Sequence, residues 1–268
     1  MNFDELLQIV ENSPSEQNLM HISGVPDEWS QGRTVFGGAT VALAYQAIRK
    51  LIGYERVLRS ISVNFVGPIN AGEAFDIEPE VLREGRSVTH ATAKIVQDGR
   101  VGLVCQACFG NSRESKIKTP NIERHDMNLP KKGRFIPQIP KVVPKFLRHF
   151  ELALEKGMPF TGSKNKEVHG WVRFKQPPEK ISDAHLLAMI DAWPPTLLQM
   201  LRWPAPASSV TWSVDFVHPH QPIKPDDWFA YQSDTRQASG GYILEEANIW
   251  DIHGELVAIS RQTVTVFD

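Results

Sequence analysis

The chain has 268 residues, which is enough for one large domain or for two domains of more ordinary size. Its composition, 41% apolar and 22% charged residues with a net charge of −2, is typical of a globular protein. No basic tract of the kind that binds nucleic acid stands out, and no apolar run is long enough to cross a membrane. The first residues do not resemble a signal peptide, and two cysteines suit a reducing compartment. We therefore expect a cytoplasmic protein without nucleic-acid or membrane partners.

The first part of the chain predicts helices followed by an antiparallel meander. Residues 3–11 predict a short amphipathic helix, and residues 19–36 predict a strand or two with a turn. Gly37 and Gly38 then precede residues 39–52, which are apolar nearly all round and therefore predict a buried helix. Four strands separated by hairpin turns are expected next, at residues 57–67, 73–83, 87–97 and 101–110.

The second part of the chain predicts the same order of elements after a linker. Residues 111–165 form the linker, with a short helix expected at 146–156 near its end. Residues 168–174 alternate as a strand, and residues 182–201 predict a helix that the Pro194–Pro195 pair must break or kink. Four strands are expected again, at residues 209–217, 227–236, 241–251 and 255–266.

Two strand sequences show that the chain repeats itself. Residues 60–68 (SISVNFVGP) match residues 211–219 (TWSVDFVHP) at a constant offset of 151 positions (211 − 60). A duplicated module should pack against its own copy as a pseudo-dimer. The predicted organisation is an N-terminal module (1–110), a linker (111–165) and a C-terminal module (166–268).

The two copies differ at Asp191. The first long helix carries no acidic residue, whereas the second carries Asp191 just before the proline break. A buried carboxylate with no basic neighbour in sequence is costly, so it needs hydrogen-bond partners or has a chemical role. Alternatively, Asp191 faces solvent at the kink or caps the helix that restarts at Pro195. Strand alternation places Thr211 on the face opposite Trp212, and both Thr211 and Gln262 could be ordinary polar strand residues.

Other chemistries lack their sequence patterns. No serine or cysteine lies in a G-x-S-x-G elbow, and the histidine spacing does not match a zinc site. Residues 36–38 are too short for a phosphate loop or a dinucleotide fingerprint. Cys105 and Cys108 have the C-x-x-C spacing but lie in an apolar strand, which favours two core residues over a redox or zinc pair. We expect no metal and no cofactor.

At these positions the chain resembles the acyl-CoA thioesterase II family, which has a double hotdog fold. Residues 33–42 (RTVFGGATVA) are similar to the family motif at the first long helix. Residues 227–229 (DWF) and 254–262 (GELVAISRQ) are similar to its closing segment. The resemblance covers both modules and is weak in the linker. It implies an α+β double hotdog, in which two tandem modules each wrap an antiparallel sheet around a long central helix.

The resemblance also implies a catalytic trio and a reaction. The family's Asp, Thr and Gln fall on Asp191, Thr211 and Gln262, with Thr211 requiring a one-residue shift in the turn that follows its strand. The implied reaction is hydrolysis of acyl-CoA to free fatty acid and CoA, with Asp191 as general base toward a water that the other two hold. A backbone N–H near Gly37 and Gly38 would polarise the thioester carbonyl.

Some features depart from the family and leave other functions open. Ser213 stands where the family often has Asp, and the Pro194–Pro195 pair could reshape the acyl tunnel. One alternative is a non-catalytic acyl-CoA binding protein on the same fold. A hotdog dehydratase or hydratase would need a histidine close to Asp191, and His185 is six residues upstream on a different helix face. Assembly into a homo-oligomer is a further expectation from the family.

Overall fold

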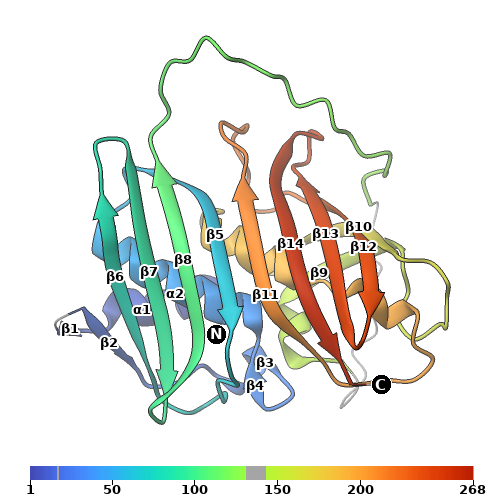
Figure 1. Ribbon diagram of the computed structural model, residues 1–268, viewed down its shortest axis with the longest axis horizontal. Helices are drawn as coiled ribbons and strands as arrows, with labels where there is room; N and C mark the ends of the chain where they lie inside the picture. Colours follow the sequence, from blue (N-terminus) through green and yellow to red (C-terminus); the bar gives the residue numbers. More distant parts are fainter. Residues whose placement is uncertain (17, 131–142, 268) are drawn as a thin grey trace.

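One antiparallel sheet organises the molecule, and the two halves of the chain supply its two sides (Figure 1). The computed structural model describes residues 1–16, 18–130 and 143–267. The N-terminal half contains α1 (Phe3–Asn12), β1 (Ser15–Glu16), β2 (Leu19–Ile22), η1 (Asp27–Trp29), β3 (Ser30–Gln31), β4 (Thr34–Val35), α2 (Gly37–Ile52), β5 (Val57–Phe65), β6 (Phe75–Glu84), β7 (Val88–Gln97) and β8 (Arg100–Gly110). The C-terminal half contains η2 (Lys145–His149), β9 (Phe150–Lys156), β10 (Glu167–Phe174), α3 (Asp183–Asp191), η3 (Thr196–Gln199), β11 (Ala207–Phe216), β12 (Phe229–Ser239), β13 (Tyr242–Trp250) and β14 (Leu256–Val266).

The two halves of the sheet join at a central seam between β5 and β11. The strand order is β1-β2-β6-β7-β8-β5 on one side and β11-β14-β13-β12-β10-β9 on the other. At the seam, Ser213 pairs with Ser62 and Thr211 pairs with Asn64. The repeat offset of 151 positions relates Ser62 to Ser213 (213 − 62). A residue that pairs with its own counterpart in antiparallel strands is what a two-fold relation between the repeats requires.

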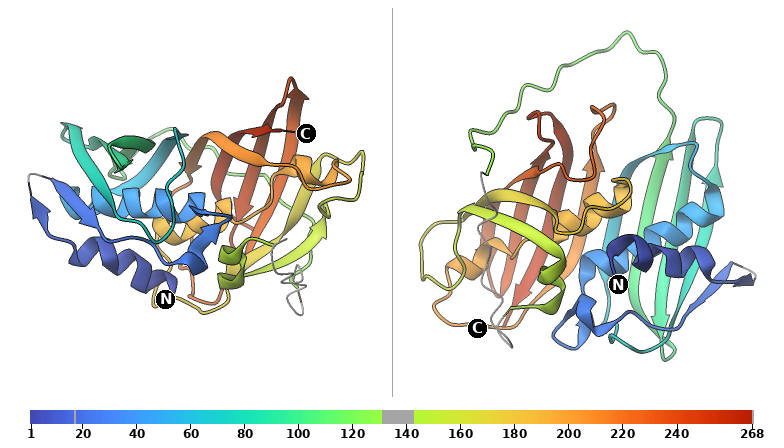
Figure 2. Two further views of the ribbon diagram at one scale, coloured as in Figure 1. Left: turned by 90° about the horizontal axis from the view of Figure 1, so that it is seen from below. Right: turned by 180° about the vertical axis from the view of Figure 1, so that it is seen from behind.

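The helices lie on one face of this sheet (Figure 2). α2 is buried from Gly38 to Arg49, and α3 is buried from Ala184 to Ile190, because both helices carry apolar or small residues on all sides. The two helices pack against each other, and α1 packs on the side of α2 that faces away from the sheet (Figure 2). The predicted helix at residues 39–52 and the eight meander strands are confirmed, with small shifts at their ends.

One element prediction needs correction, and the predicted proline break is confirmed. The helix expected at residues 146–156 is wrong: a 3-10 turn leads into β9, which pairs with β10 at the edge of the sheet. Phe150 and Leu152 alternate toward the core, which suits a strand better than a helix. The helix expected at 182–201 ends at Asp191, and Pro195 precedes the short turn η3. This is the break that the two prolines impose.

Residues 111–130, the first described stretch of the linker, have no helix or strand and run from the end of β8 to the C-terminal half (Figure 1). There, Met127 packs against a small cluster that includes Trp171, Trp228 and Trp250, and the ring of His125 makes T-shaped contacts with Trp171 and Trp250. The N-terminal end of the linker is exposed. Among the helices that the structure describes, none has both the length and the apolar character needed to cross a membrane.

Candidate active site

Asp191 lies where the two halves of the chain meet. It is the last residue of α3, and its side chain approaches the first turn of α2. A Cβ atom added at Gly37 would lie 2.8 Å from Asp191 Oδ2, and one added at Gly38 would lie 3.0 Å from Asp191 Cβ. The N-cap residue Phe36 offers no side-chain hydrogen bond to this helix start. The two glycines therefore give the carboxylate room to sit at the positive end of α2.

The surroundings of Asp191 change its protonation. The pKa of Asp191 is raised to about 7, chiefly by burial and to a smaller extent by the nearby Glu245 carboxyl. Hydrogen bonds from the Gly38 backbone N–H and from Gln262 act in the opposite direction and lower the pKa. The residue as a whole is only half-buried. Asp191 is therefore a carboxyl group that changes charge near neutral pH, which is the range that a general base needs.

Gln262 on β14 connects Asp191 to a hydroxyl group. Its Nε2 donates to Asp191 Oδ1 at 3.3 Å and to Ser209 Oγ at 2.5 Å. Ser209 lies near the start of β11, the neighbouring strand. The structure thus brings together a carboxylate, an amide and a hydroxyl, with two of the sequence-predicted site residues, Asp191 and Gln262, in direct contact.

The third predicted residue, Thr211, lies outside this cluster. Along the β11–β14 pair, Ser209 pairs with Val264 and Thr211 pairs with Thr263, so two steps on β11 match one step on β14. This β-bulge places Ser209 on the face of Gln262, whereas Thr211 points to the opposite face and is exposed. The structure therefore brings Ser209, and not Thr211, into contact with Gln262. An unbroken alternation cannot reveal a bulge, because every residue before the extra one changes face.

A second residue that the sequence left unremarked is Glu245 on β13. It pairs with Gln262 in register, so its side chain shares the face that points toward α3. The side chain is buried, with 4% of the residue exposed. The signal that could have found it is the alternation of residues 242–250, in which Glu245 falls in phase with the buried Ile243 and Ala247.

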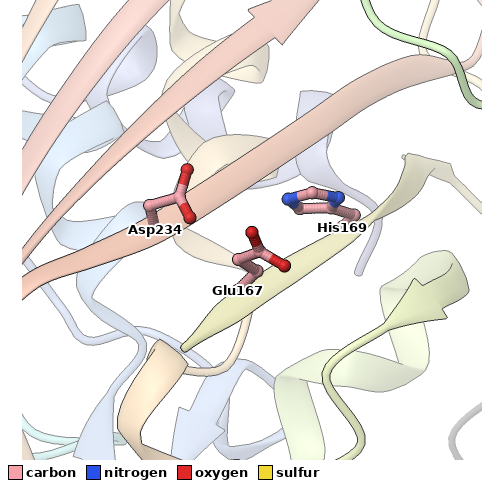
Figure 3. Close-up of side chains that lie close together, drawn as sticks. All are labelled: Glu167, His169 and Asp234. Atoms are coloured by element: carbon pink, nitrogen blue, oxygen red, sulfur yellow. The ribbon is translucent and has the colours of Figure 1, made fainter. Parts of the chain in front are cut away.

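Another cluster of ionisable side chains lies on the opposite face of the sheet. Glu167 and His169 on β10 approach Asp234 on β12, and their ligand atoms all lie within 4.8 Å of one another (Figure 3). Such a set could bind a divalent cation. Lys156, however, forms an ion pair with Glu167 and lowers the pKa of His169, after the larger effect of burial. We assign no metal to this cluster, because an ammonium group already neutralises one of its carboxylates.

The remaining candidates have structural partners. His185 is buried at the start of α3, where it contacts Ser182 and lies 3.0 Å from Asp4. Cys105 faces the core and Cys108 does not, because residues three apart on a strand point to opposite faces. Burial raises the pKa of the Cys105 thiol to about 12, so it is not a nucleophile at neutral pH.

Comparisons with known proteins agree on one family. Residues 25–110 match the acyl-CoA thioesterase N-terminal domain, and residues 125–266 match the acyl-CoA thioesterase C-terminal domain. Acyl-CoA thioesterase 2 of Haemophilus influenzae is 24% identical over 253 residues, covering 86% of each chain. A hot dog fold protein of unknown function from Alicyclobacillus acidocaldarius superposes with a TM-score of 0.82 at 23% identity over 98% of both chains. An acyl-CoA thioesterase II from Mycobacterium marinum gives 0.74 at 19% identity, over 99% of this chain and 98% of its own.

Proposed function

The chain belongs to the acyl-CoA thioesterase family and is a thioester hydrolase with a hotdog fold, and we propose that it cleaves acyl-CoA to free fatty acid and CoA with water activated by Asp191. The observation that carries this proposal is the contact of the Asp191 carboxylate with Gln262 at the start of α2. At this contact a carboxylate that titrates near neutral pH, the Gln262 amide and the start of α2 lie close together.

In the proposed reaction, Asp191 takes a proton from a water molecule as that water attacks the thioester carbonyl carbon. Gln262 holds the carboxylate in place, and the Ser209 hydroxyl, which accepts from the same amide, orients the water. The tetrahedral intermediate then expels the CoA thiolate, which takes up the proton that Asp191 removed from the water, and no covalent enzyme intermediate forms. Thr211 has no role in this proposal, because it lies on the other face of the sheet.

The carbonyl oxygen needs a donor in the transition state, and the N-terminus of α2 is suited to supply it. The Gly38 N–H already lowers the pKa of Asp191 by hydrogen bonding to its carboxylate. We therefore propose that the backbone N–H of Gly37, one position nearer the helix start, donates to the thioester carbonyl oxygen. The N–H of Gly38 meanwhile holds the Asp191 carboxylate. An oxyanion beside this helix start gains from the same positive end that attracts Asp191.

The proposed site needs both repeats of the chain. The helix start comes from the N-terminal module, while the base, the amide and the hydroxyl come from the C-terminal module. We interpret the chain as a double hotdog in which α2 and α3 are the central helices of two copies. The module boundaries at 110 and 166, a cytoplasmic location and assembly into a homo-oligomer stay predictions.

The test is release of free CoA thiol from acyl-CoAs of short to long chain length, measured for wild type, Asp191→Asn and Asp215→Asn. Asp215 lies on β11 and is exposed, so its variant is a matched control. We expect the Asp191 variant to lose about 100-fold or more of kcat, because a general base contributes that much, and the Asp215 variant to match wild type. Wild type that binds acyl-CoA without releasing thiol would instead identify a non-catalytic acyl-CoA binding protein.

A further inference from the structure

Glu245 is a buried carboxyl group that the proposed reaction does not use. It lies in the middle of a polar row that crosses three neighbouring strands, from Thr235 on β12 through Glu245 on β13 to Gln262 on β14. Thr235 is 5% exposed and Glu245 is 4% exposed, so both are inside the protein. A carboxyl group in such a place is costly unless its hydrogen bonds are made.

The partner of Glu245 is Thr196, the first residue of η3. Glu245 Oε2 accepts from the Thr196 backbone N–H at 2.9 Å and from Thr196 Oγ1 at 2.6 Å. Thr196 Oγ1 also lies 2.7 Å from Thr235 Oγ1. Thr196 itself is 1% exposed. Glu245 therefore fastens the start of η3 to the sheet through both the main chain and the side chain of one residue.

The turn that Glu245 holds, η3, begins shortly after Asp191. Only residues 192–195 separate Asp191 from Thr196, and the last two of them are prolines, whose fixed φ limits how far the segment can bend. Trp193 in this segment stacks on Tyr231 of β12, with ring centroids 5.0 Å apart. The carboxylate of Asp191 meets Gln262 at one end of the segment, and Thr196 meets Glu245 at the other. Since Gln262 and Glu245 pair in register, both ends rest on adjacent positions of the same sheet.

We propose that Glu245 is a positioning residue for the hydrolysis: by holding Thr196, it fixes the turn after α3 and keeps the Asp191 carboxylate against Gln262. This inference rests on the proposed function, since it assigns a role beside the same site. Proximity and orientation of a base decide much of its rate contribution, so loss of the anchor should slow turnover without removing the base. Glu245 touches no reacting atom in this proposal.

The charge of Glu245 offers a second readout. Burial and the Glu245 carboxyl both raise the pKa of Asp191. Burial also raises the pKa of Glu245 itself and of Tyr231, the other titratable group near both carboxyls. The two carboxyls therefore titrate as a coupled pair, and removing the charge of one should make the other easier to ionise.

The experiment compares Glu245→Gln, Glu245→Leu and Thr196→Val with the matched control Glu246→Gln. Glu246 is the next residue along β13 and pairs with Arg236 and Arg261 on the other face. Glu245→Gln keeps an oxygen for Thr196, so we expect kcat close to wild type but an acid limb of the pH profile at lower pH. Glu245→Leu removes the anchor and should lower kcat about 10-fold or more with little change in KM. Thr196→Val should give a smaller loss, and Glu246→Gln should change neither quantity.

A purely structural role would lower thermal stability while leaving kcat per folded molecule and the acid limb unchanged in all three variants, and that result overturns the proposal. If Glu245→Leu does not fold, the Glu245→Gln profile and the Thr196→Val rate decide the question. A carboxyl ¹³C NMR titration, assigned with Asp191→Asn, follows the pKa of Asp191 without any turnover. If wild type releases no thiol, the proposed function fails. The NMR titration then still tests the link: a lower pKa of Asp191 in Glu245→Gln supports it, and an unchanged pKa overturns it.

Discussion

At the residue scale, the hydroxyl of Ser209 is the group whose role is easiest to isolate. It accepts from Gln262 Nε2, and its loss leaves that amide with Asp191 alone. We expect Ser209→Ala to lower kcat about 10-fold, the effect of losing one buried hydrogen bond in the transition state. Thr211→Val, a nearly isosteric change two positions along the same strand, should keep wild-type kcat. Steady-state kinetics of both variants check this, and a larger loss in Thr211→Val would contradict the assignment of Ser209.

Protonation of Asp191 should govern the pH dependence of turnover. Because burial raises the pKa of Asp191 to about 7, the base is largely protonated in mildly acidic solution. We expect kcat/KM to rise with pH through about 7 and then to level. A pH profile of kcat/KM, measured with an acyl-CoA whose acyl chain carries no ionisable group, checks this. An acid limb near the ordinary range of an aspartate would show that the carboxyl is better solvated than its burial indicates.

The same shift has a consequence for stability that needs no turnover. The pKa of Asp191 is raised from 3.8 to about 7 by folding, so the folded chain binds this proton more tightly than the unfolded chain does. Its contribution to stability is complete below pH 3.8 and is lost as the pH rises through about 7. Asp191→Asn has no carboxyl to ionise at this position, so the variant should not lose this stability as the pH rises. Denaturant melts should show the variant gaining about 4 kcal/mol on wild type at pH 8 and little at pH 4.

At the element scale, α2 begins with two glycines, Gly37 and Gly38, whose lack of a side chain leaves room for Asp191. A Cβ atom at Gly38 would lie 2.6 Å from the Phe36 ring and 3.0 Å from Asp191 Cβ, so the ring must move and Asp191 must also shift by a few tenths of an ångström. Gly38→Ala should therefore lower kcat about 10-fold or more by displacing the base. Gly67→Ala, where the added atom meets nothing closer than 3.4 Å, is the control and should stay near wild type. Equal effects in both variants would indicate a general loss of stability.

The elements themselves were largely predictable because their hydrophobic periods are clear. The apolar run at residues 39–52 predicted a buried helix, and alternation together with glycine turns predicted the meander strands. The bulge before Thr211 was not predictable, since it depends on how β11 pairs with β14 rather than on either strand alone. β9 was missed for a related reason: it is an edge strand whose pattern also fits a short helix.

The site was predictable in part. Asp191 was singled out because a carboxylate on an apolar helix is costly, and Gln262 because of the closing motif, and the structure brings the two side chains into contact. Ser209 is defined by a partner on another strand, so no local pattern identifies it. The alternation of residues 242–250 marks Glu245 as buried, but its contact with Thr196 depends on a turn outside its strand. Positions set by pairing across a sheet need the register, which a single sequence does not provide.

At the scale of the whole molecule, a buried polar contact ties the two halves together. Tyr45 OH on α2 donates to Asp183 Oδ2 on α3 at 2.8 Å, and Arg49, which is 3% exposed, lies 3.4 Å from the same oxygen. Asp183→Asn leaves the buried guanidinium without its counter-charge and should cost about 2 kcal/mol of unfolding free energy. Glu78→Gln, which breaks an exposed pair with Lys94, should cost less than about 0.5 kcal/mol.

Denaturant unfolding followed by fluorescence and by circular dichroism measures both variants. Because α2 and α3 pack against each other and β5 pairs with β11, we expect one transition in which the halves unfold together. Two separate transitions in wild type would contradict this expectation.

α2 and α3 meet at two places, and different residues lie at each of them. Where α3 ends and α2 starts, Asp191 faces two glycines; where α2 ends and α3 starts, Asp183 holds Tyr45 and Arg49. In a symmetric dimer of identical chains these two places would carry the same residues, so a residue needed for the proposed reaction would be present at both. A single chain that carries both copies is free of that constraint, so Asp191 can serve the proposed reaction at one place while Asp183 holds the two helices together at the other. Each chain should therefore turn over a single acyl-CoA at a time.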